Sequence, residues 1–311
     1  MSTNFSDAED RRLVALALAY QRQRRRIAWT AVAFAMRRTR RSPLELRERV
    51  KTLKRTHGAD LVRFPASLLP LGGVTARSLD PDSSMLELEA AEAALIAIFG
   101  AVTPREIRHV AGDRHLNAGE LVPLAVDAVI RTADVSAGDV FVDVGSGVGN
   151  VVAQVALQTR ARKCIGVEIR RELCVRGQQL MRRCELRARL LPKVAIVCGD
   201  AVDVCLATTR PMNESTVVYL NNILFQAATN VHLTAQLCAL PRARVIAATA
   251  VFCARHREPC RTAFCRVWEL FTTERVPASW TAELVCVYFY RRRQQEVEIT
   301  ETATRVGIDG L

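Results

Sequence analysis

Several features are scarce in this 311-residue chain, and each narrows what the chain can be. Aromatic residues make up 5% of it, the ten cysteines never form a CxxC pair, and the five histidines do not cluster with them at zinc-ligand spacings. The sequence therefore predicts no metal site and free thiols in a reducing compartment. No apolar run is long enough to cross a bilayer and no apolar signal peptide opens the chain, so we expect no membrane partner.

Acidic residues are scarce in one segment. Residues 11–55 hold fifteen Lys and Arg residues against only Glu45 and Glu48, whereas the remainder is close to neutral. This segment lacks glycine and is rich in Ala, Leu and Arg, which predicts two or three helices, with Ser42-Pro43 opening the last. Its arginine clusters can neutralise nucleic-acid phosphates without reading sequence, or can be a solvated surface. They are Arg22, Arg24, Arg25, Arg26, Arg37, Arg38, Arg40 and Arg41.

Short apolar, β-branched runs follow from residue 139 onward. Helix-length segments separate the first three runs, which predicts an α/β fold with a mostly parallel sheet covered on both faces. Two final runs have no helix between them and predict an antiparallel pair at one edge. The runs are 139–144, 163–169, 194–200, 216–222 and 243–249, then 267–276 and 283–292. Upstream, residues 56–83 resemble an irregular linker, and helices are expected over 85–99 and 121–133.

The stretch FVDVGSGVGN at residues 141–150 places glycines at the end of the first predicted strand. Such a loop allows a ligand to approach the backbone, and the helix after it offers free N–H groups. A dinucleotide fingerprint needs glycine or alanine where this chain has Asn150. Asp143 would also repel a pyrophosphate, whereas it suits the ammonium of an amino acid.

Carboxylates end the next two predicted strands. Glu168 can accept both hydroxyls of a ribose, and Asp200 can accept a hydrogen bond from an adenine amino group. An amino-acid tail, a ribose and an adenine together describe S-adenosylmethionine. Either acid could instead be a solvated strand end, and a nicotinamide dehydrogenase is the rival interpretation.

Two amides, Asn221 and Asn222, end the fourth predicted strand. Ligands bind at the carboxyl ends of strands in open α/β sheets, so Asn221 can offer its carbonyl oxygen to an incoming amine. Asparagine is also common in plain turns.

The combination of these motifs resembles the Dot-one, or disruptor-of-telomeric-silencing, histone methyltransferases, which are non-SET enzymes that methylate a lysine in the core of histone H3. The resemblance covers roughly residues 117–292. The motifs are GELVP at 119–123, FVDVGSGVGN, GVE at 166–168, VVYLNNILF at 217–225 and SWT at 279–281. The compact length is similar to that of the kinetoplastid branch.

The resemblance implies a class I S-adenosylmethionine-dependent methyltransferase, located in the nucleus and acting on histone H3 in nucleosomes, with nucleosomal DNA contacted by the basic arm. Four residues would form the lysine side: Asn221, Phe225, Trp280 and Tyr288. The cofactor would be held by Ala118, Gly119, Glu120, Leu121, Phe141, Val142, Asp143, Val144, Gly145, Ser146, Gly147, Val148, Gly149, Asn150, Glu168, Asp200 and Ala201.

The chain departs from the family pattern at several positions. Ala118 and Ala201 stand where the family has aromatic residues, and the tyrosine expected in the lysine channel falls on Val287, with Tyr288 next. We therefore keep two alternatives, a methyltransferase for RNA or another protein and a catalytically weak chromatin scaffold. The predicted regions are a basic arm and linker at 1–83, a helical lead-in with a cofactor-closing loop at 84–138, the catalytic domain at 139–292 and a tail at 293–311.

Overall fold

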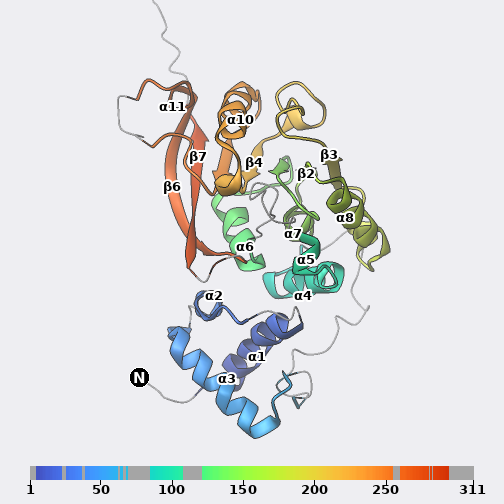
Figure 1. The fold of residues 1–311 in the computed structure, drawn as a ribbon, viewed down its shortest axis with the longest axis vertical. Coiled ribbons are helices and arrows are strands. Elements are labelled where there is room, and N and C mark those ends of the chain that lie inside the picture. Colours follow the sequence, from blue (N-terminus) through green and yellow to red (C-terminus); the bar gives the residue numbers. More distant parts are fainter. Residues whose placement is uncertain are drawn as a thin grey trace, which may run out of the picture.

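A computed structural model shows an α/β sheet domain above a smaller group of helices (Figure 1). The structure describes residues 5–22, 26–36, 39–61, 64–65, 68, 85–107, 121–254, 260–279, 281 and 283–293.

The N-terminal helices have a hydrophobic core of their own. They are α1 (Asp7–Arg22), α2 (Trp29–Ala35) and α3 (Pro43–His57). Ser42 caps α3 by the reciprocal side-chain and backbone hydrogen bonds of a capping box with Glu45, and Pro43 occupies the first turn, as the sequence predicted. Leucines such as Leu13 and Leu46 meet between the helices, fully buried. We refer to α1–α3 as the helical arm.

Three helices connect this arm to the sheet. They are α4 (Leu88–Phe99), α5 (Pro104–Ile107) and α6 (Pro123–Thr132). Pro123 stands at the first helical position of α6, where its missing N–H costs no hydrogen bond. Six of the ten residues of α6 are buried, so this helix lies inside the molecule against the sheet.

Seven strands form one sheet in the order β3-β2-β1-β4-β5-β7-β6. The first five are parallel, and β7 is antiparallel to both β5 and β6. The strands are β1 (Val140–Val144), β2 (Lys163–Glu168), β3 (Val194–Cys198), β4 (Val217–Leu220), β5 (Val245–Ala248), β6 (Trp268–Pro277) and β7 (Leu284–Arg292). The mostly parallel sheet with an antiparallel edge pair confirms the predicted class I methyltransferase fold.

Helices cover both faces of this sheet. Alternate strand residues point to opposite faces, so Phe141 packs with α4, α6 and α7 (Asn150–Gln158), while Val142 packs with α10 (Ala227–Ala239). The remaining helices are α8 (Arg171–Arg183), α9 (Arg187–Leu190) and α11 (Ala263–Val267), with short 3₁₀ turns η4 (Met212–Glu214) and η5 (Asn222–Leu224). No helix in the described part of the chain has the length and apolarity to span a membrane.

The carboxyl ends of the central strands lie at one level. Val144 at the end of β1 pairs with Val167 of β2 and with Leu220 of β4. Leu220 pairs with Ala248 of β5, which in turn pairs with Tyr288 of β7. The loops that follow these strands therefore meet at a single edge of the sheet, which is where open α/β sheets bind ligands.

Candidate active site

The glycine loop after β1 needs glycine for conformational reasons. Gly145, Gly147 and Gly149 all have positive φ angles, of 85°, 57° and 86°. Other residues rarely adopt this left-handed conformation. The loop is anchored because the N–H groups of Gly145 and Ser146 both donate to the carbonyl of Val167 in β2. The loop backbone is thereby fixed to β2, and Gly145 is its exposed residue at the edge formed by the carboxyl ends of the strands.

Phe225 lies directly against this loop. A Cβ atom added to Gly145 would approach the Phe225 ring to 3.0 Å. The two residues were predicted for different halves of the site, Gly145 for the cofactor and Phe225 for the lysine channel. The structure therefore brings the two predicted halves into contact.

Glu168 at the end of β2 faces the same loop. Its side chain is buried, and its two carboxylate oxygens accept hydrogen bonds from Gly147 N and Arg170 N, each at 2.8 Å. Burial raises the pKa of this carboxyl, and the two backbone donors oppose that effect. A carboxylate held by backbone in this way is preoriented to accept hydroxyl hydrogens from a ligand in the loop.

Buried polar atoms beside the loop lack partners. Among the described residues, Ser146 Oγ, Asn150 Oδ1 and the Tyr219 hydroxyl are buried and make no hydrogen bond. Tyr219 lies next to Asp143 on the adjacent strand, and burial and then the Asp143 charge raise its pKa. Native proteins leave few such groups unsatisfied, so these atoms suit a ligand or an ordered water that would complete them.

Several predicted cofactor residues have their side chains in the hydrophobic core. Phe141, Val142, Val144 and Val148 have buried side chains in the hydrophobic core, on the two faces of the sheet. Asp143 is buried at the strand end. The sequence motif is therefore a mixture of core residues and of backbone that a ligand can approach.

Asp200 and Ala201 lie in the turn after β3. The Asp200 carboxylate accepts a hydrogen bond from Val202 N at 2.9 Å, and its carbonyl oxygen accepts from Asp203 and Val204. The turn follows Cys198, which pairs with Glu168 across β2 and β3. Asp200 and Glu168 therefore come from adjacent strand ends, as predicted.

Asn221 at the end of β4 is held by the loop after β5. Its Oδ1 accepts a hydrogen bond from the Thr249 hydroxyl at 2.9 Å, and Thr249 Oγ1 in turn accepts from Ile223 N at 3.2 Å. Thr249 thus holds the Asn221 side chain, a contact that the sequence did not predict.

Asn222 has a different role from its neighbour. It is buried, its Nδ2 donates to Asn230 Oδ1 at 3.0 Å, and its Oδ1 accepts from Ala250 N at 2.8 Å. These bonds join the loops after β4 and β5 to α10. Of the two adjacent amides, Asn222 joins the two loops to α10, whereas Asn221 is bonded to Thr249.

Tyr288 and Val287 lie on opposite faces of β7. Val287 is fully buried and packs in the core on the α6 face. Tyr288 is half-buried beside Ala248, near the edge of the sheet formed by the carboxyl ends of the parallel strands. The two side chains therefore lie on opposite faces of the sheet, and the role of Tyr288 in the lysine channel stays a prediction.

Two predicted loop motifs meet across the chain. Leu121 of GELVP forms an isolated antiparallel bridge with Ala278, the residue before SWT, so the two motifs lie close together. The neighbouring predicted residues Ala118, Gly119, Glu120 and Trp280 lie outside the described residues, and their roles stay predictions.

The arginines predicted to bind phosphates differ in their exposure and in their partners. Arg26 and Arg40 are exposed on the helical arm. The Arg41 side chain is 12% exposed, pairs with Glu9 at 3.1 Å and lies over the Phe5 ring, and its contact with DNA stays a prediction. The side chain of Arg22, and Arg24, Arg25, Arg37 and Arg38 as a whole, lie outside the described residues.

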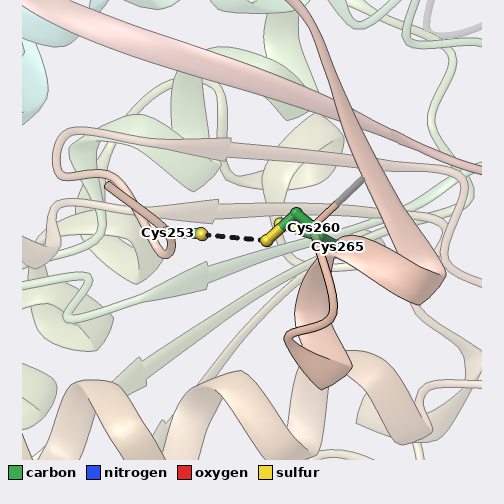
Figure 2. Close-up of side chains that lie close together, drawn as sticks. All are labelled: Cys253, Cys260 and Cys265. Carbon is green, nitrogen blue, oxygen red and sulfur yellow. Dashed lines mark hydrogen bonds between the residues drawn. The ribbon is translucent and has the colours of Figure 1, made fainter. Parts of the chain in front are cut away.

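Three cysteines form a cluster that sequence reasoning missed. Cys253, Cys260 and Cys265 come together near β5 and α11 (Figure 2). Hydrogen bonds with the hydroxyl and backbone of Thr262 lower the pKa of the Cys260 thiol to about 7. Their spacing, C-x₆-C-x₄-C, is wider than the short pairs by which metal sites are sought in a sequence.

Comparisons with known proteins agree with these features. Two curated relatives are H3 lysine-79 specific histone-lysine N-methyltransferases, one from Aspergillus fumigatus (30% identical over 165 residues) and one from Emericella nidulans (29% over 165). Each match covers 51% of this chain and 32% of the relative, so the chain matches about a third of their length.

Among solved structures, an RNA methyltransferase from Salinibacter ruber in complex with S-adenosyl-L-homocysteine aligns with a TM-score of 0.38 and 19% identity, over 56% of this chain and 93% of that one. The model of the family described as histone methylation protein DOT1 matches residues 101–291. This match spans more than half of the sequence, and the chain belongs to the DOT1 family of histone methylation proteins.

Proposed function

We propose that this chain transfers a methyl group from S-adenosylmethionine to a lysine of histone H3 in nucleosomes, at the lysine-79-type position that the names of its relatives specify. The observation that carries the proposal is the contact of Phe225 with Gly145, because it joins a cofactor loop to an acceptor side within a DOT1-family chain. Nuclear location and nucleosomal DNA as a partner follow from the same proposal.

The residues at the loop fit this cofactor. S-adenosylmethionine supplies, when bound, an activated methyl group on a sulfonium and an amino-acid tail. Asp143 offers a buried negative charge for an ammonium, and Glu168 offers carboxylate oxygens for ribose hydroxyls. Gly145 has no side chain, so a ligand can approach its backbone beside the Phe225 ring. Asp200 and Ala201 would lie at the adenine.

The residues on the acceptor side would orient the lysine amine, and none of them would act as a strong general base. A lysine ammonium has a pKa near ~10.4, so presenting the neutral amine at pH 7 costs about 4.6 kcal/mol at ~1.36 kcal/mol per pKa unit. A desolvated channel lowers that pKa and offsets part of the cost. The Asn221 side chain, held by Thr249 at Oδ1, would orient the amine. Phe225, Tyr288 and Trp280 would line the channel, and the proton would pass to water.

The proposal is tested with labelled S-adenosylmethionine and, separately, nucleosomes, free histones and total RNA. We expect label on histone H3 in nucleosomes. Asn221→Ala should lower kcat by about tenfold or more with cofactor affinity nearly kept, since one orienting hydrogen bond is lost. Glu168→Ala should instead weaken cofactor binding, measured by calorimetry with S-adenosylhomocysteine.

Gln226→Ala is the matched control, because Gln226 is an exposed polar residue in the same loop. It should keep both kcat and cofactor affinity. Label on RNA alone would assign a different acceptor, and cofactor binding without label on any acceptor would identify a scaffold. Either result would refute the proposed function, as would affinity for NADH in place of S-adenosylhomocysteine.

A further inference from the structure

Three thiols lie together where the chain leaves β5 and enters α11 (Figure 2). The sulfur atoms of Cys253, Cys260 and Cys265 all lie within 4.8 Å of one another, and the Cys253 and Cys260 sulfurs are 3.6 Å apart. Cys253 and Cys265 are buried, and Cys260 is partly exposed. None of the three belongs to the site proposed for methyl transfer.

The spacing of the sulfur atoms matches that of a metal centre. Zinc binds thiolates at about 2.3 Å in tetrahedral geometry, which places two ligand sulfurs about 3.8 Å apart. The 3.6 Å separation of Cys253 and Cys260 is close to this value. The third sulfur requires a shift on the order of 1 Å, within the reach of a side-chain rotation.

Aromatic packing holds the segments that carry the thiols. Phe252, next to Cys253, and Phe264, next to Cys265, have ring centroids 4.7 Å apart. Phe264 meets the Tyr290 ring edge-on at 5.1 Å, and Tyr290 in turn accepts a hydrogen bond from Phe252 N. Two cysteines are thus fixed through their neighbours on a buried aromatic cluster, so little chain entropy remains to be lost when a ligand joins them.

Thr262 and Arg293 make hydrogen bonds with two of the three cysteines. The Thr262 hydroxyl accepts from Cys265 N at 3.3 Å and lies 3.5 Å from the Cys260 sulfur. Arg293 Nε donates to the Cys265 carbonyl at 2.8 Å. Such bonds orient the ligands of a metal, and nearby cations such as Arg261 and Arg266 offset the charge of several thiolates.

We propose that Cys253, Cys260 and Cys265 bind one zinc ion, with water at the fourth tetrahedral corner. Binding forms three Zn–S bonds and releases the three thiol protons to solvent. The ion closes the connection between β5 and α11 and thereby stabilises the loop that carries Thr249. The site is separate from the edge of the sheet where methyl transfer is proposed.

The experiment measures metal content of the full chain, purified under reducing conditions without chelator. Mass spectrometry of the metal should give about one zinc ion per chain. Cys260→Ser should lose the zinc, whereas Cys260→His, which keeps a ligand at that position, should retain it. Cys184→Ser is the matched control, since Cys184 lies in another part of the fold, and its zinc content should equal that of the wild type. Cobalt in place of zinc should show intense visible bands of tetrahedral thiolate coordination.

The outcome is decisive even if one variant fails to fold, because the wild type, Cys184→Ser and Cys260→His report metal content by themselves. Absence of zinc in the reduced wild type would overturn the proposal. So would a Cys253–Cys260 disulfide found by peptide mapping in place of metal, or equal zinc in wild type and a folded Cys260→Ser. None of these readouts uses methyl transfer, so this proposal and the proposed function fail separately.

Discussion

Thr249 shows how a single hydroxyl can set the geometry of a site. It donates to Asn221 Oδ1 and accepts from Ile223 N, so it ties together the two chain segments that leave β4 and β5. Its side chain is buried, so water cannot easily replace it. Asn221 is therefore oriented before any acceptor arrives, and orientation of this kind contributes to rate more than to ground-state binding.

We predict that Thr249→Val, which removes this hydroxyl at nearly constant volume, lowers kcat by about tenfold, the value of one hydrogen bond of roughly 1–1.5 kcal/mol. The KM for S-adenosylmethionine should stay the same, because Thr249 does not contact the glycine loop. Steady-state kinetics with nucleosomes measures both constants. Thr249→Ser keeps the hydroxyl and should recover most of the activity, so equal kcat values for the Val and Ser variants would contradict this role.

At the scale of elements, one buried carboxylate joins the starts of three strands. Asp139 precedes β1, accepts from Thr216 before β4 at 2.6 Å, and pairs with Arg244 before β5 at 2.8 Å. Burial by itself would raise the pKa of Asp139, but hydrogen bonds from Arg244, Thr216 and Ser136 outweigh it and lower the pKa to about 2. This network joins the starts of β1, β4 and β5, at the end of the sheet opposite the candidate site.

The contribution of Asp139 should be visible in the pH dependence of the free energy of unfolding. Because the folded-state pKa lies below the unfolded value, Asp139 contributes stability that is full above about pH 4 and lost as pH falls through about 2. Asp139→Asn should lower the free energy of unfolding by about 2 kcal/mol at pH 7, and its difference from wild type should shrink below pH 4. Urea titrations at several pH values measure this. A difference that is constant with pH would refute the assignment.

The strands and most helices could be predicted because their signals are local. Runs such as 139–144 and 216–222 are apolar, β-branched and bounded by turn residues, and each contains a strand of the sheet. The antiparallel β6–β7 pair followed from the absence of a helix between its runs. Strand order could not be derived this way, because it depends on long-range pairing.

Part of the candidate site could also be predicted from local sequence signals. Asp143, Glu168 and Asn221 end strands, so their position at one edge follows from the fold. The Thr249 hydrogen bond, the framework role of Asn222 and the cysteine cluster depend on how separate loops meet, and loop contacts leave no periodic pattern. The Arg41–Glu9 ion pair could not be predicted either, because the two residues are 32 positions apart in sequence.

At the scale of the whole molecule, the helical arm packs on the sheet domain around a cavity of about 90 Å³. The cavity is lined by side chains of α1, α2, α4 and the start of α6, and Glu92 of α4 lies among them. Burial raises the pKa of Glu92 to about 7, helped by Glu89 and Asp127 and opposed by Arg12. The junction between the arm and the sheet domain (Figure 1) therefore contains a carboxyl that is poorly stabilised as an anion.

Docking of the arm should weaken as pH rises. Since the folded-state pKa of Glu92 is raised, its neutral form favours the folded state below about pH 4.5, and that contribution is lost as pH passes about 7. We predict that Glu92→Gln raises Tm by roughly 2–5 °C at pH 8 and has little effect at pH 5. Calorimetry measures this, with Glu185→Gln, an exposed residue on the sheet domain, as the control. A Tm gain that is equal at both pH values would contradict it.

The exposed arginines of the arm should bind DNA electrostatically. If Arg26 and Arg40 contact phosphates, the Arg26→Glu/Arg40→Glu double variant should weaken nucleosome binding and reduce the slope of log K against log salt by about 2, since each contact contributes roughly 0.9. The matched control is Arg182→Glu/Arg183→Glu, which changes the same charge on exposed residues of α8. Mobility shifts over a range of salt measure the slope. If both double variants weakened nucleosome binding equally, the net charge of the protein, and not the helical arm, would explain the binding.

The outermost strand, β6, has a consequence for the behaviour of the protein at high concentration. Its register with β7 shifts between Leu270 and Thr272, it carries Glu274 and Arg275, and it ends in Pro277. A bulge, charges and a proline all discourage another strand from adding to a sheet edge. The partly exposed Phe271 is the apolar exception, and Arg291 lies over its ring at 6.0 Å. This edge is thus protected against strand-to-strand aggregation.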